Sequence, residues 1–440
     1  MSECLIMKLA EIFNDNMVLQ RDKEICLFGC GEGELIVDFC GKTYNFLSKT
    51  DKFCFYLPPH KAGGPFDMKV KINGEESIIK NILIGDVYIA AGQSNMELTL
   101  KDTADIEYFN NENIRLFTEP NNVDEDNNPI HNSADWIACE GKNANDFSAI
   151  GYYFANKLQK HSGVPVGIIS CSKGASRVDA WTAPEYVNTE RYQEMQKVRH
   201  NDYHYYKFNH NSYLYNNKLL NIVPFTNSGV LWYQGESNRG IVESVYYAEM
   251  LRIMINNWRD IWNDNLPFYI VQLMPYIDNP ETSDWAMIRA QQEKASKTVD
   301  NTYLVTLVNT GESNEIHPVN KKTVANALAN AVRSNQFNEC VEYCGPVLES
   351  YSKTENGIEL KFSHADGLNI RGDKLCDLKA YSQSGEELPF ETKISDKALS
   401  VLLTNNVILS KITLGYSNAP EHNLYNSSGY LASPFSIEIN

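Results

Sequence analysis

The sequence lacks an excess of basic residues, since 39 Lys and Arg stand against 56 Asp and Glu and give a formal net charge of −17. An acidic surface repels nucleic acids and anionic membranes. The chain also lacks an apolar run of membrane-spanning length, and residues 1–13 lack the uninterrupted apolar core of a secretory signal. We therefore expect a small-molecule substrate, no nucleic-acid or membrane partner, and a cytoplasmic location.

A second pair of metal-binding residues is also missing. Cys340 and Cys344 form one pair, but no other Cys or His pair follows at zinc-binding spacing. Because a cytoplasmic protein keeps its thiols reduced, the 10 cysteines are expected to be free and mostly buried. The sequence therefore predicts no metal, no cofactor and no disulfide framework.

The length of 440 residues predicts two or three domains. Residues 1–80 contain short alternating strands separated by Gly-rich turns, which is typical of a small antiparallel β domain. In residues 81–335, strands alternate with amphipathic helices, which predicts an α/β domain with a parallel sheet and helices on both faces. Strand patterns return in residues 336–440 and predict a second β region.

The apolar run of residues 82–91 ends abruptly at the sequence Gly-Gln-Ser-Asn of residues 92–95. This pattern predicts a buried strand that delivers Ser94 to a tight turn. Functional residues of open α/β sheets collect at the carboxyl ends of the strands. A hydroxyl is a weak nucleophile, so Ser94 can act only with a base and oxyanion donors nearby.

Three further turns follow predicted strands or open a helix. Residues 170–175 supply Gly174, residues 234–238 supply the side-chain amide of Asn238, and residues 315–318 supply His317. A serine, a glycine N–H, an asparagine amide and an imidazole are the groups that acyl transfer needs, without a metal or a phosphate.

These four stretches resemble four conserved blocks of the SGNH hydrolase superfamily, and the chain as a whole resembles the sialate O-acetylesterase family of carbohydrate esterases. The pairing of GQSNME with WYQGESN carries most of the specificity. The matching stretches are residues 15–21, 61–65, 84–86, 92–97, 232–238, 316–318, 423–426 and 432–435. The resemblance implies a three-layer α/β/α core with a parallel sheet, flanked by N- and C-terminal antiparallel β-sandwich-like regions.

The resemblance implies Ser94 as nucleophile, His317 as base, and Gly174 and Asn238 as oxyanion donors beside the N–H of Ser94. The acid that orients the base is less clear, because many relatives carry an aspartate where this chain has Asn314. Glu315 is the preferred candidate and Glu236 its rival. Glu315 could instead only cap the following helix.

Other polar residues of these blocks are candidates for substrate binding. They are Gln93, Gln234 and Arg177. Arg177 could hold a sugar carboxylate through its planar fork or form a structural pair with Asp179, and the sequence favours neither. The family usually has an aromatic residue and two glycines in its second block, whereas residues 172–175 here are Ser-Lys-Gly-Ala. Lys173 could change what the pocket accepts, but a solvated loop lysine is slightly favoured. Asn309 also departs from the family pattern, which commonly has an acid there.

The resemblance implies hydrolysis of O-acetyl groups on sugars, with O-acetylated sialic acid as the first substrate candidate. Acetylated xylan or another plant glycan is the alternative. A catalytically silent sugar-binding protein is a third hypothesis, from a different functional class. The sequence gives no indication of the oligomeric state.

Overall fold

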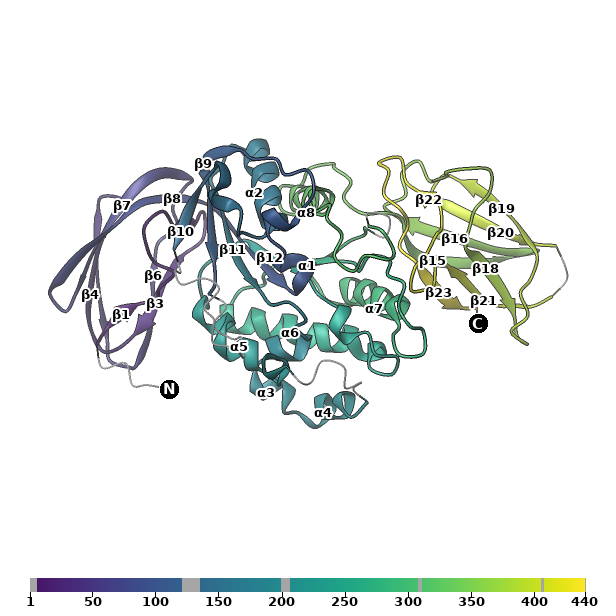
Figure 1. Cartoon of the computed structure of the whole chain (residues 1–440), viewed down its shortest axis with the longest axis horizontal. Coiled ribbons are helices and arrows are strands. Elements are labelled where there is room, and N and C mark those ends of the chain that lie inside the picture. The colour runs from purple at the N-terminus through teal and green to yellow at the C-terminus, as the bar shows by residue number, and fades with distance from the viewer. Residues whose placement is uncertain (1–5, 121–134, 199–205, 308–310, 405–406, 440) are drawn as a thin grey trace. The chain divides into compact units, whose positions relative to one another are not determined.

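The computed structural model describes residues 6–120, 135–198, 206–307, 311–404 and 407–439 (Figure 1). The chain divides into two compact units. The first unit comprises Met1–Gln193, Asn201–Trp232 and Ile253–Phe268, and the second comprises Glu194–His200, Tyr233–Arg252 and Tyr269–Asn440. The fold is mixed α/β, with a mixed sheet and additional antiparallel sheets.

The described elements have the following bounds. The strands before residue 235 are β1 (Lys8–Leu9), β2 (Val18–Gln20), β3 (Ile25–Cys30), β4 (Gly33–Phe39), β5 (Lys42–Ser48), β6 (Lys52–Leu57), β7 (Gly63–Ile72), β8 (Glu75–Gly92), β9 (Asn110–Thr118), β10 (Trp136–Glu140), β11 (Val166–Ser172) and β12 (Gly229–Tyr233). The later strands are β13 (Phe268–Val271), β14 (Thr302–Val305), β15 (Val347–Thr354), β16 (Gly357–Ser363), β17 (Asn369–Ile370), β18 (Leu378–Ser382), β19 (Phe390–Ser395), β20 (Ala398–Leu403), β21 (Leu409–Leu414), β22 (Leu424–Tyr425) and β23 (Phe435–Glu438). The α-helices are α1 (Ser94–Glu97), α2 (Ala149–Ser162), α3 (Pro184–Val187), α4 (Glu190–Gln196), α5 (Tyr213–Asn217), α6 (Tyr247–Trp262), α7 (Trp285–Thr298) and α8 (Lys322–Asn335).

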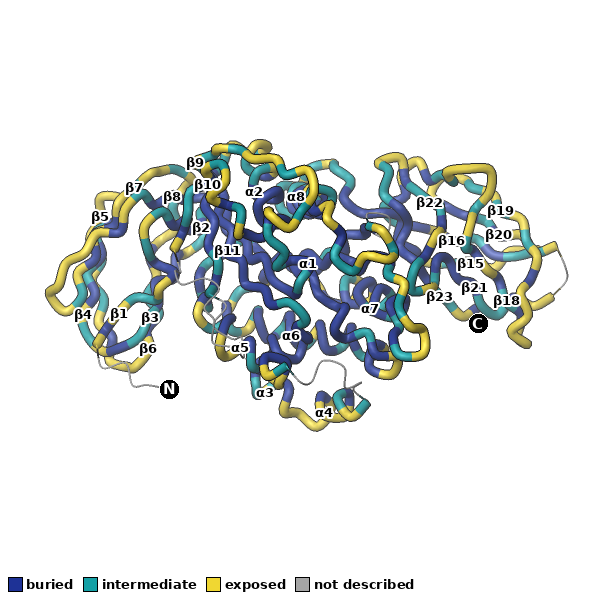
Figure 2. The backbone as a smooth tube through the Cα atoms, viewed as in Figure 1, coloured by how far each residue is buried: buried dark blue, intermediate teal, exposed yellow. Residues whose placement is uncertain are grey.

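Strand β8 is the centre of the first unit. All its residues from Ile82 to Gly92 are buried, as expected for a strand covered on both faces, whereas the earlier part of the strand, residues 75–81, is mostly exposed (Figure 2). Its carboxyl-terminal half pairs in parallel with β11, and β11 pairs in parallel with β9. Strand β10 joins β9 in the antiparallel direction, so the sheet is mixed.

Helix α2 covers part of this sheet by packing against β11 and β9. It begins after Ser148, whose hydroxyl accepts a hydrogen bond from the N–H of Gly151 at 3.2 Å. It ends at Gly163, whose φ of 68° lies in the left-handed region that glycine adopts without strain. The apolar residues at helical spacing in residues 150–160 predict a helix from the sequence, and α2 confirms it.

The N-terminal strands belong to the same unit as this sheet. Strand β7 pairs antiparallel with the first half of β8, and β2 pairs in parallel with its middle. Arg21, which follows β2, donates two hydrogen bonds to the carboxylate of Asp86 at 2.8 and 3.0 Å. Both residues lie in stretches that carry the family resemblance, and their bidentate pair gives those stretches a structural role.

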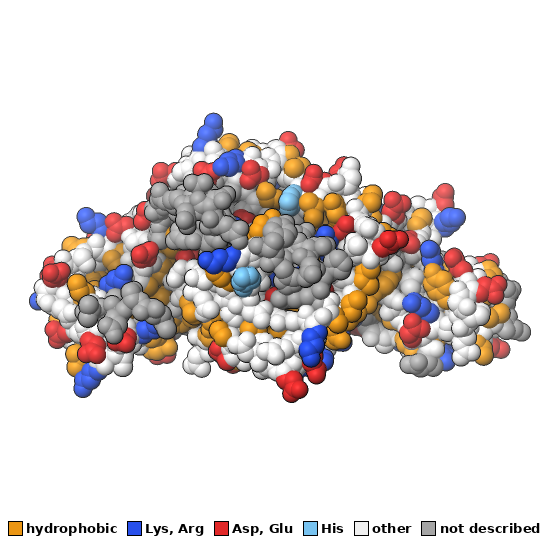
Figure 3. Space-filling model, turned by 60° about the horizontal axis from the view of Figure 1, so that its bottom comes forward, with side chains coloured by type: hydrophobic (Ala, Val, Ile, Leu, Met, Phe, Trp, Pro, Cys, Tyr) orange, Lys and Arg blue, Asp and Glu red, His pale blue; other side chains and the backbone are white. Residues whose placement is uncertain are grey.

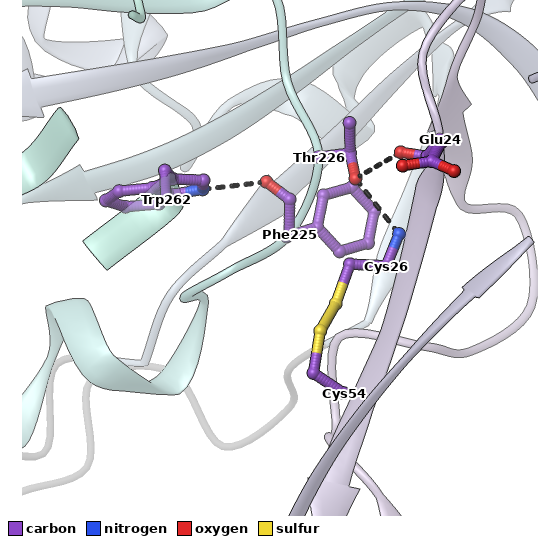
Figure 4. The surroundings of a disulfide bond; sticks show 6 residues. All are labelled: Glu24, Cys26, Cys54, Phe225, Thr226 and Trp262. Atoms are coloured by element: carbon purple, nitrogen blue, oxygen red, sulfur yellow. Dashed lines mark hydrogen bonds between the residues drawn. A yellow bond between two sulfur atoms is a disulfide. The ribbon is translucent and has the colours of Figure 1, made fainter. Parts of the chain in front are cut away.

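Strands β3 and β6 are neighbours joined by a disulfide between Cys26 and Cys54 (Figure 4). Their Cα atoms are 6.0 Å apart, a separation that a disulfide can bridge. Thr226 attaches β3 to the rest of the unit, because its hydroxyl accepts from the N–H of Cys26 and donates to the carbonyl of Glu24. The expectation of reduced thiols is therefore wrong for this pair.

The second unit contains β13 and β14, helices α7 and α8, and the C-terminal sheets. Helix α8 buries one apolar face that includes Val324, Leu328 and Val332. The C-terminal strands form a four-stranded sheet in the order β15-β16-β20-β19 and a three-stranded sheet in the order β18-β21-β23. Their inner faces share one core, which includes Leu360, Val401 and Leu414.

Most elements that the sequence predicts are confirmed. The sequence pattern predicts a strand over residues 229–233 and an amphipathic helix over residues 247–262, and β12 and α6 have these bounds. Strand β5 was not predicted. Its residues alternate between exposed and half-buried positions and it pairs with β4, so it shows little apolar periodicity. Most of the loop predicted at residues 118–132 and part of the lid-like segment predicted at 191–217 lie outside the described residues, as does Asn309.

Candidate active site

Ser94 is the first residue of α1 and lies two residues beyond the end of β8. The turn can form because Gly92 adopts a φ of 136°, which side-chain-bearing residues rarely adopt. Gln93 precedes the helix and is buried, whereas Ser94 is half-buried. The structure thus places the hydroxyl of Ser94 where a parallel strand gives way to a helix, as predicted.

Gly174 lies beside Ser94 because β11 runs parallel to β8 with Ser172 opposite Gly92. The N–H of Lys173 bonds to the carbonyl of Gly92 at 3.0 Å and holds the two turns together. A Cβ built on Gly174 would lie 3.6 Å from the Cβ of Ser94, so the backbone of Gly174 is adjacent to Ser94.

A cavity of about 510 Å³ opens at this point of the first unit. Its lining includes Ser94, Glu97, Thr99, Ser172, Lys173 and Lys218. The volume is within the range of small-molecule sites. Lys173 is only 8% exposed, and its ammonium lies 4.9 Å from the centre of the Phe208 ring. The interpretation of Lys173 as a solvated loop lysine is therefore wrong.

Arg177 is buried with Asp179 in the loop that follows Gly174. Arg177 is 1% exposed, and its Nε lies 3.7 Å from a carboxylate oxygen of Asp179. Its backbone N–H donates to the side chain of Asn209 at 2.9 Å. This burial favours the structural pair over direct binding of a sugar carboxylate.

In the second unit, the turn after β12 places Gln234, Glu236 and Asn238. Gln234 is fully buried and donates from Nε2 to Oδ1 of Asn238 at 2.8 Å. Tyr247, the first residue of α6, donates its hydroxyl to Oε1 of Gln234 at 2.7 Å. Since Oδ1 of Asn238 faces Gln234, the Nδ2 donor of Asn238 is directed away from it. Gln234 thus fixes the orientation of the Asn238 side chain, which the sequence predicts to be an oxyanion donor.

His317 and Glu315 lie together in the turn before α8. Oε1 of Glu315 accepts a hydrogen bond from the backbone N–H of His317 at 2.9 Å. Burial and the positive charge of Lys321 lower the pKa of the His317 imidazole below its usual 6.5, while the negative charge of Glu315 opposes the change. An imidazole with a lowered pKa is neutral at pH 7 and can accept a proton.

Lys321 is the group that sequence reasoning missed in this unit. It is 1% exposed, and burial lowers its pKa to about 8, against the opposing charges of Glu236 and Glu315. Glu236 is itself only 3% exposed. His317 and Lys321 both precede α8, which begins at Lys322, so no helical spacing in the sequence signals their interaction.

Among the described residues, no group of three or more His, Cys, Asp and Glu is arranged to hold a metal ion. Within the same ranges, no helix has the length and apolar character needed to cross a membrane.

Comparison with known proteins identifies the family to which this chain belongs. Residues 84–333 match the family model described as carbohydrate esterase, sialic acid-specific acetylesterase. The matched range includes Ser94, Gly174, Asn238 and His317.

Individual relatives agree with this match. The chain is 23% identical to the human sialate O-acetylesterase over 376 residues, which cover 76% of this chain and 71% of the human protein. The mouse sialate O-acetylesterase gives 23% identity over 402 residues. The crystal structure of a carbohydrate acetylesterase from Xanthomonas citri matches 98% of this chain and 99% of its own, with a TM-score of 0.84 and 28% identity.

Proposed function

Because the chain belongs to the sialic acid-specific acetylesterase family of carbohydrate esterases, we propose that it removes O-acetyl groups from sialic acid through an acetyl-Ser94 intermediate. It is a carboxylic ester hydrolase that acts on acetylated sugars. One observation carries the proposed mechanism: Ser94 lines a cavity at the end of β8, directly beside the backbone of Gly174.

In this mechanism, His317 takes the proton of Ser94 as the hydroxyl oxygen attacks the acetyl carbonyl. The negative charge on the carbonyl oxygen is stabilised by the N–H groups of Ser94 and Gly174 and by the amide of Asn238. The C–O bond to the sugar then breaks, and His317 returns the proton to the sugar oxygen. Water then attacks the carbonyl of the acetyl-enzyme, with His317 again taking and returning the proton, and acetate is released from Ser94.

Substitutions at these positions test the mechanism. Ser94→Ala and His317→Ala should nearly abolish hydrolysis of 4-nitrophenyl acetate and of O-acetylated sialic acid. Asn238→Ala should lower kcat by about 100- to 1,000-fold, the usual cost of losing one oxyanion donor. Circular dichroism should show a native fold for all three variants. Full activity of Ser94→Ala would contradict the proposal, and an inactive wild-type protein would favour the sugar-binding hypothesis.

We propose Glu315 as the acid that orients His317, with Glu236 as the rival. The effect of Glu315 on the pKa of His317 supports this choice, while the burial of Glu236 supports the rival. If Glu315 orients the base, Glu315→Gln should lower kcat far more than Glu236→Gln. The reverse order would transfer the role to Glu236.

Lys173 supports an anionic sugar over acetylated xylan, because a buried cation beside the nucleophile favours a negatively charged substrate. Lys173→Met should raise KM for O-acetylated sialic acid and leave kcat/KM for acetylated xylo-oligosaccharides unchanged. A wild-type preference for the xylo-oligosaccharides would favour the alternative substrate class.

The three-layer arrangement of the catalytic domain and the boundaries near residues 80 and 335 are part of the same proposal. Strand β8 runs continuously from Glu75 to Gly92 and therefore crosses the first boundary. The cytoplasmic location also remains part of the proposal, although the reduced thiols expected from it are not found at Cys26 and Cys54, which form a disulfide.

A further inference from the structure

The N–H of Gly174 already has an acceptor in this structure. It donates to Oε2 of Glu97 at 2.5 Å. Glu97 is the last residue of α1, the short helix that begins with Ser94. A Cβ built on Gly174 would lie 2.9 Å from the same carboxylate oxygen. A carboxylate thus occupies a donor that the proposed reaction assigns to the acetyl oxygen.

The loop that contains Gly174 is held by several other hydrogen bonds. The carbonyl of Gly92 accepts from the N–H of Lys173 at 3.0 Å and from the hydroxyl of Ser176 at 3.3 Å. Nδ2 of Asn209 donates to the carbonyl of Ala175 at 2.9 Å. These bonds fix the loop from both sides of Gly174, so Glu97 is not required to anchor it.

Glu97 also lines the cavity in which Ser94 lies. The same lining carries charges of both signs, namely Lys101, Lys173 and Lys218 together with Asp102, Glu119 and Asp146. A carboxylate that leaves Gly174 therefore remains in a polar cavity that also holds ammonium groups and has room for a ligand. An ionised carboxylate is a strong acceptor, and a hydrogen bond to it is stronger than one to a neutral carbonyl oxygen.

We propose that Glu97 is a displaceable occupant of the oxyanion site, holding the N–H of Gly174 in the free protein and yielding it to the acetyl oxygen as the ester reacts. This inference rests on the proposed function of Ser94 and Gly174. Substrate binding must break the bond between Glu97 and Gly174, which lowers activity toward esters too small to supply compensating contacts. Glu97 thereby favours acetylated sugars over simple acetate esters.

The test compares wild type, Glu97→Ala, Glu97→Gln and the control Glu75→Gln. Glu75 is exposed in the hairpin between β7 and β8, so its substitution removes one negative charge away from the cavity. The readouts are kcat/KM for 4-nitrophenyl acetate and the inhibition constant of phenylboronic acid. The boronate forms a tetrahedral adduct with an active serine and places an oxygen in the oxyanion site.

Glu97→Ala should raise kcat/KM for 4-nitrophenyl acetate and tighten boronate inhibition, each by about tenfold, since the charge-assisted bond no longer has to be broken. Glu97→Gln keeps a weaker acceptor and should lie between Glu97→Ala and wild type. Glu75→Gln should match wild type. Melting temperatures close to wild type would show that both Glu97 variants fold.

A fall in kcat/KM or weaker boronate inhibition in folded Glu97→Ala would overturn the inference and make Glu97 a residue that positions Gly174. Unchanged values would also overturn it. The double variant Ser94→Ala/Glu97→Ala separates the two proposals. If it is inactive while Glu97→Ala gives no gain, only the role of Glu97 fails; if it is active, the nucleophile assignment fails.

Discussion

At the scale of residues, the electrostatics around His317 determine at which pH it can act as the proposed base. The imidazole must be neutral to accept the proton of Ser94. Both burial and Lys321 disfavour its protonated form, so the pKa lies below 6.5. Lys321 is charged below its own pKa of about 8, and its influence is therefore present throughout the acidic range.

The pH profile of kcat/KM provides the corresponding prediction. Activity should fall as the pH decreases through a value below 6.5, because His317 becomes protonated. In Lys321→Met, the neighbouring positive charge is gone, the pKa of His317 rises, and the acidic limb should move to higher pH. The check is kcat/KM for 4-nitrophenyl acetate between pH 4 and 9, with a melting curve at each pH. An acidic limb that stays in place or moves lower would contradict this account of Lys321.

At the scale of elements, the turn after β12 depends on helix α6. Tyr247 at the start of α6 bonds to Gln234, and Gln234 bonds to Asn238. Tyr247 also donates to the backbone carbonyl of Gln234 at 2.9 Å. These bonds restrict Gln234 and through it the amide of Asn238, so they would hold the proposed oxyanion donor in place.

Tyr247→Phe tests this support. The substitution keeps the ring that packs in the core and removes the hydroxyl, so Gln234 and Asn238 become less constrained. We expect kcat to fall by about tenfold with little change in KM, since the oxyanion donor acts mainly in the transition state. Tyr246→Phe, a substitution at a neighbouring half-buried tyrosine, is the matched control. Equal activity of both variants would mean that Tyr247 has no part in positioning Asn238.

The sequence predicted helices and strands well where burial gives the apolar residues a clear pattern along the chain. The apolar run of β8 and the amphipathic pattern of α6 both have clear periodicity, and both elements are present. Four turns with their functional side chains could be found because each follows or precedes such an element. Glu97 and Lys321 could not be assigned from sequence, because their importance comes from contacts with Gly174 and His317 rather than from a motif.

At the scale of the whole molecule, charge and cysteine content have different predictive value. The net charge of −17 follows from composition alone, and Figure 3 shows acidic and basic side chains interspersed over the face that it presents. The Cys26–Cys54 bond depends on two strands being neighbours, which spacing along the chain does not reveal. The prediction of free thiols is wrong for this pair, because it rested on an assumed compartment rather than on geometry, whereas cysteines such as Cys139, Cys171 and Cys344 are free and buried as predicted.

The disulfide can be checked directly. After denaturation without a reductant, Cys26 and Cys54 should resist alkylation, and both should react once a reductant is added. Removing the bond in Cys26→Ser should destabilise the first unit by about 2–4 kcal/mol, measured by denaturant unfolding. Cys40→Ser, at an exposed free cysteine of the same unit, should leave stability unchanged. Alkylation of Cys26 and Cys54 in the unreduced protein would show that the bond is absent.

The central claim is that Ser94 carries the acetyl group during turnover. The most direct measurement is mass spectrometry of the protein quenched in acid during hydrolysis of O-acetylated sialic acid, followed by digestion and peptide mapping. We expect one acetyl group on the peptide that contains Ser94 in the wild-type protein and none in Ser94→Ala. Acetate release without acetylation of that peptide, retained in Ser94→Ala, would contradict the account.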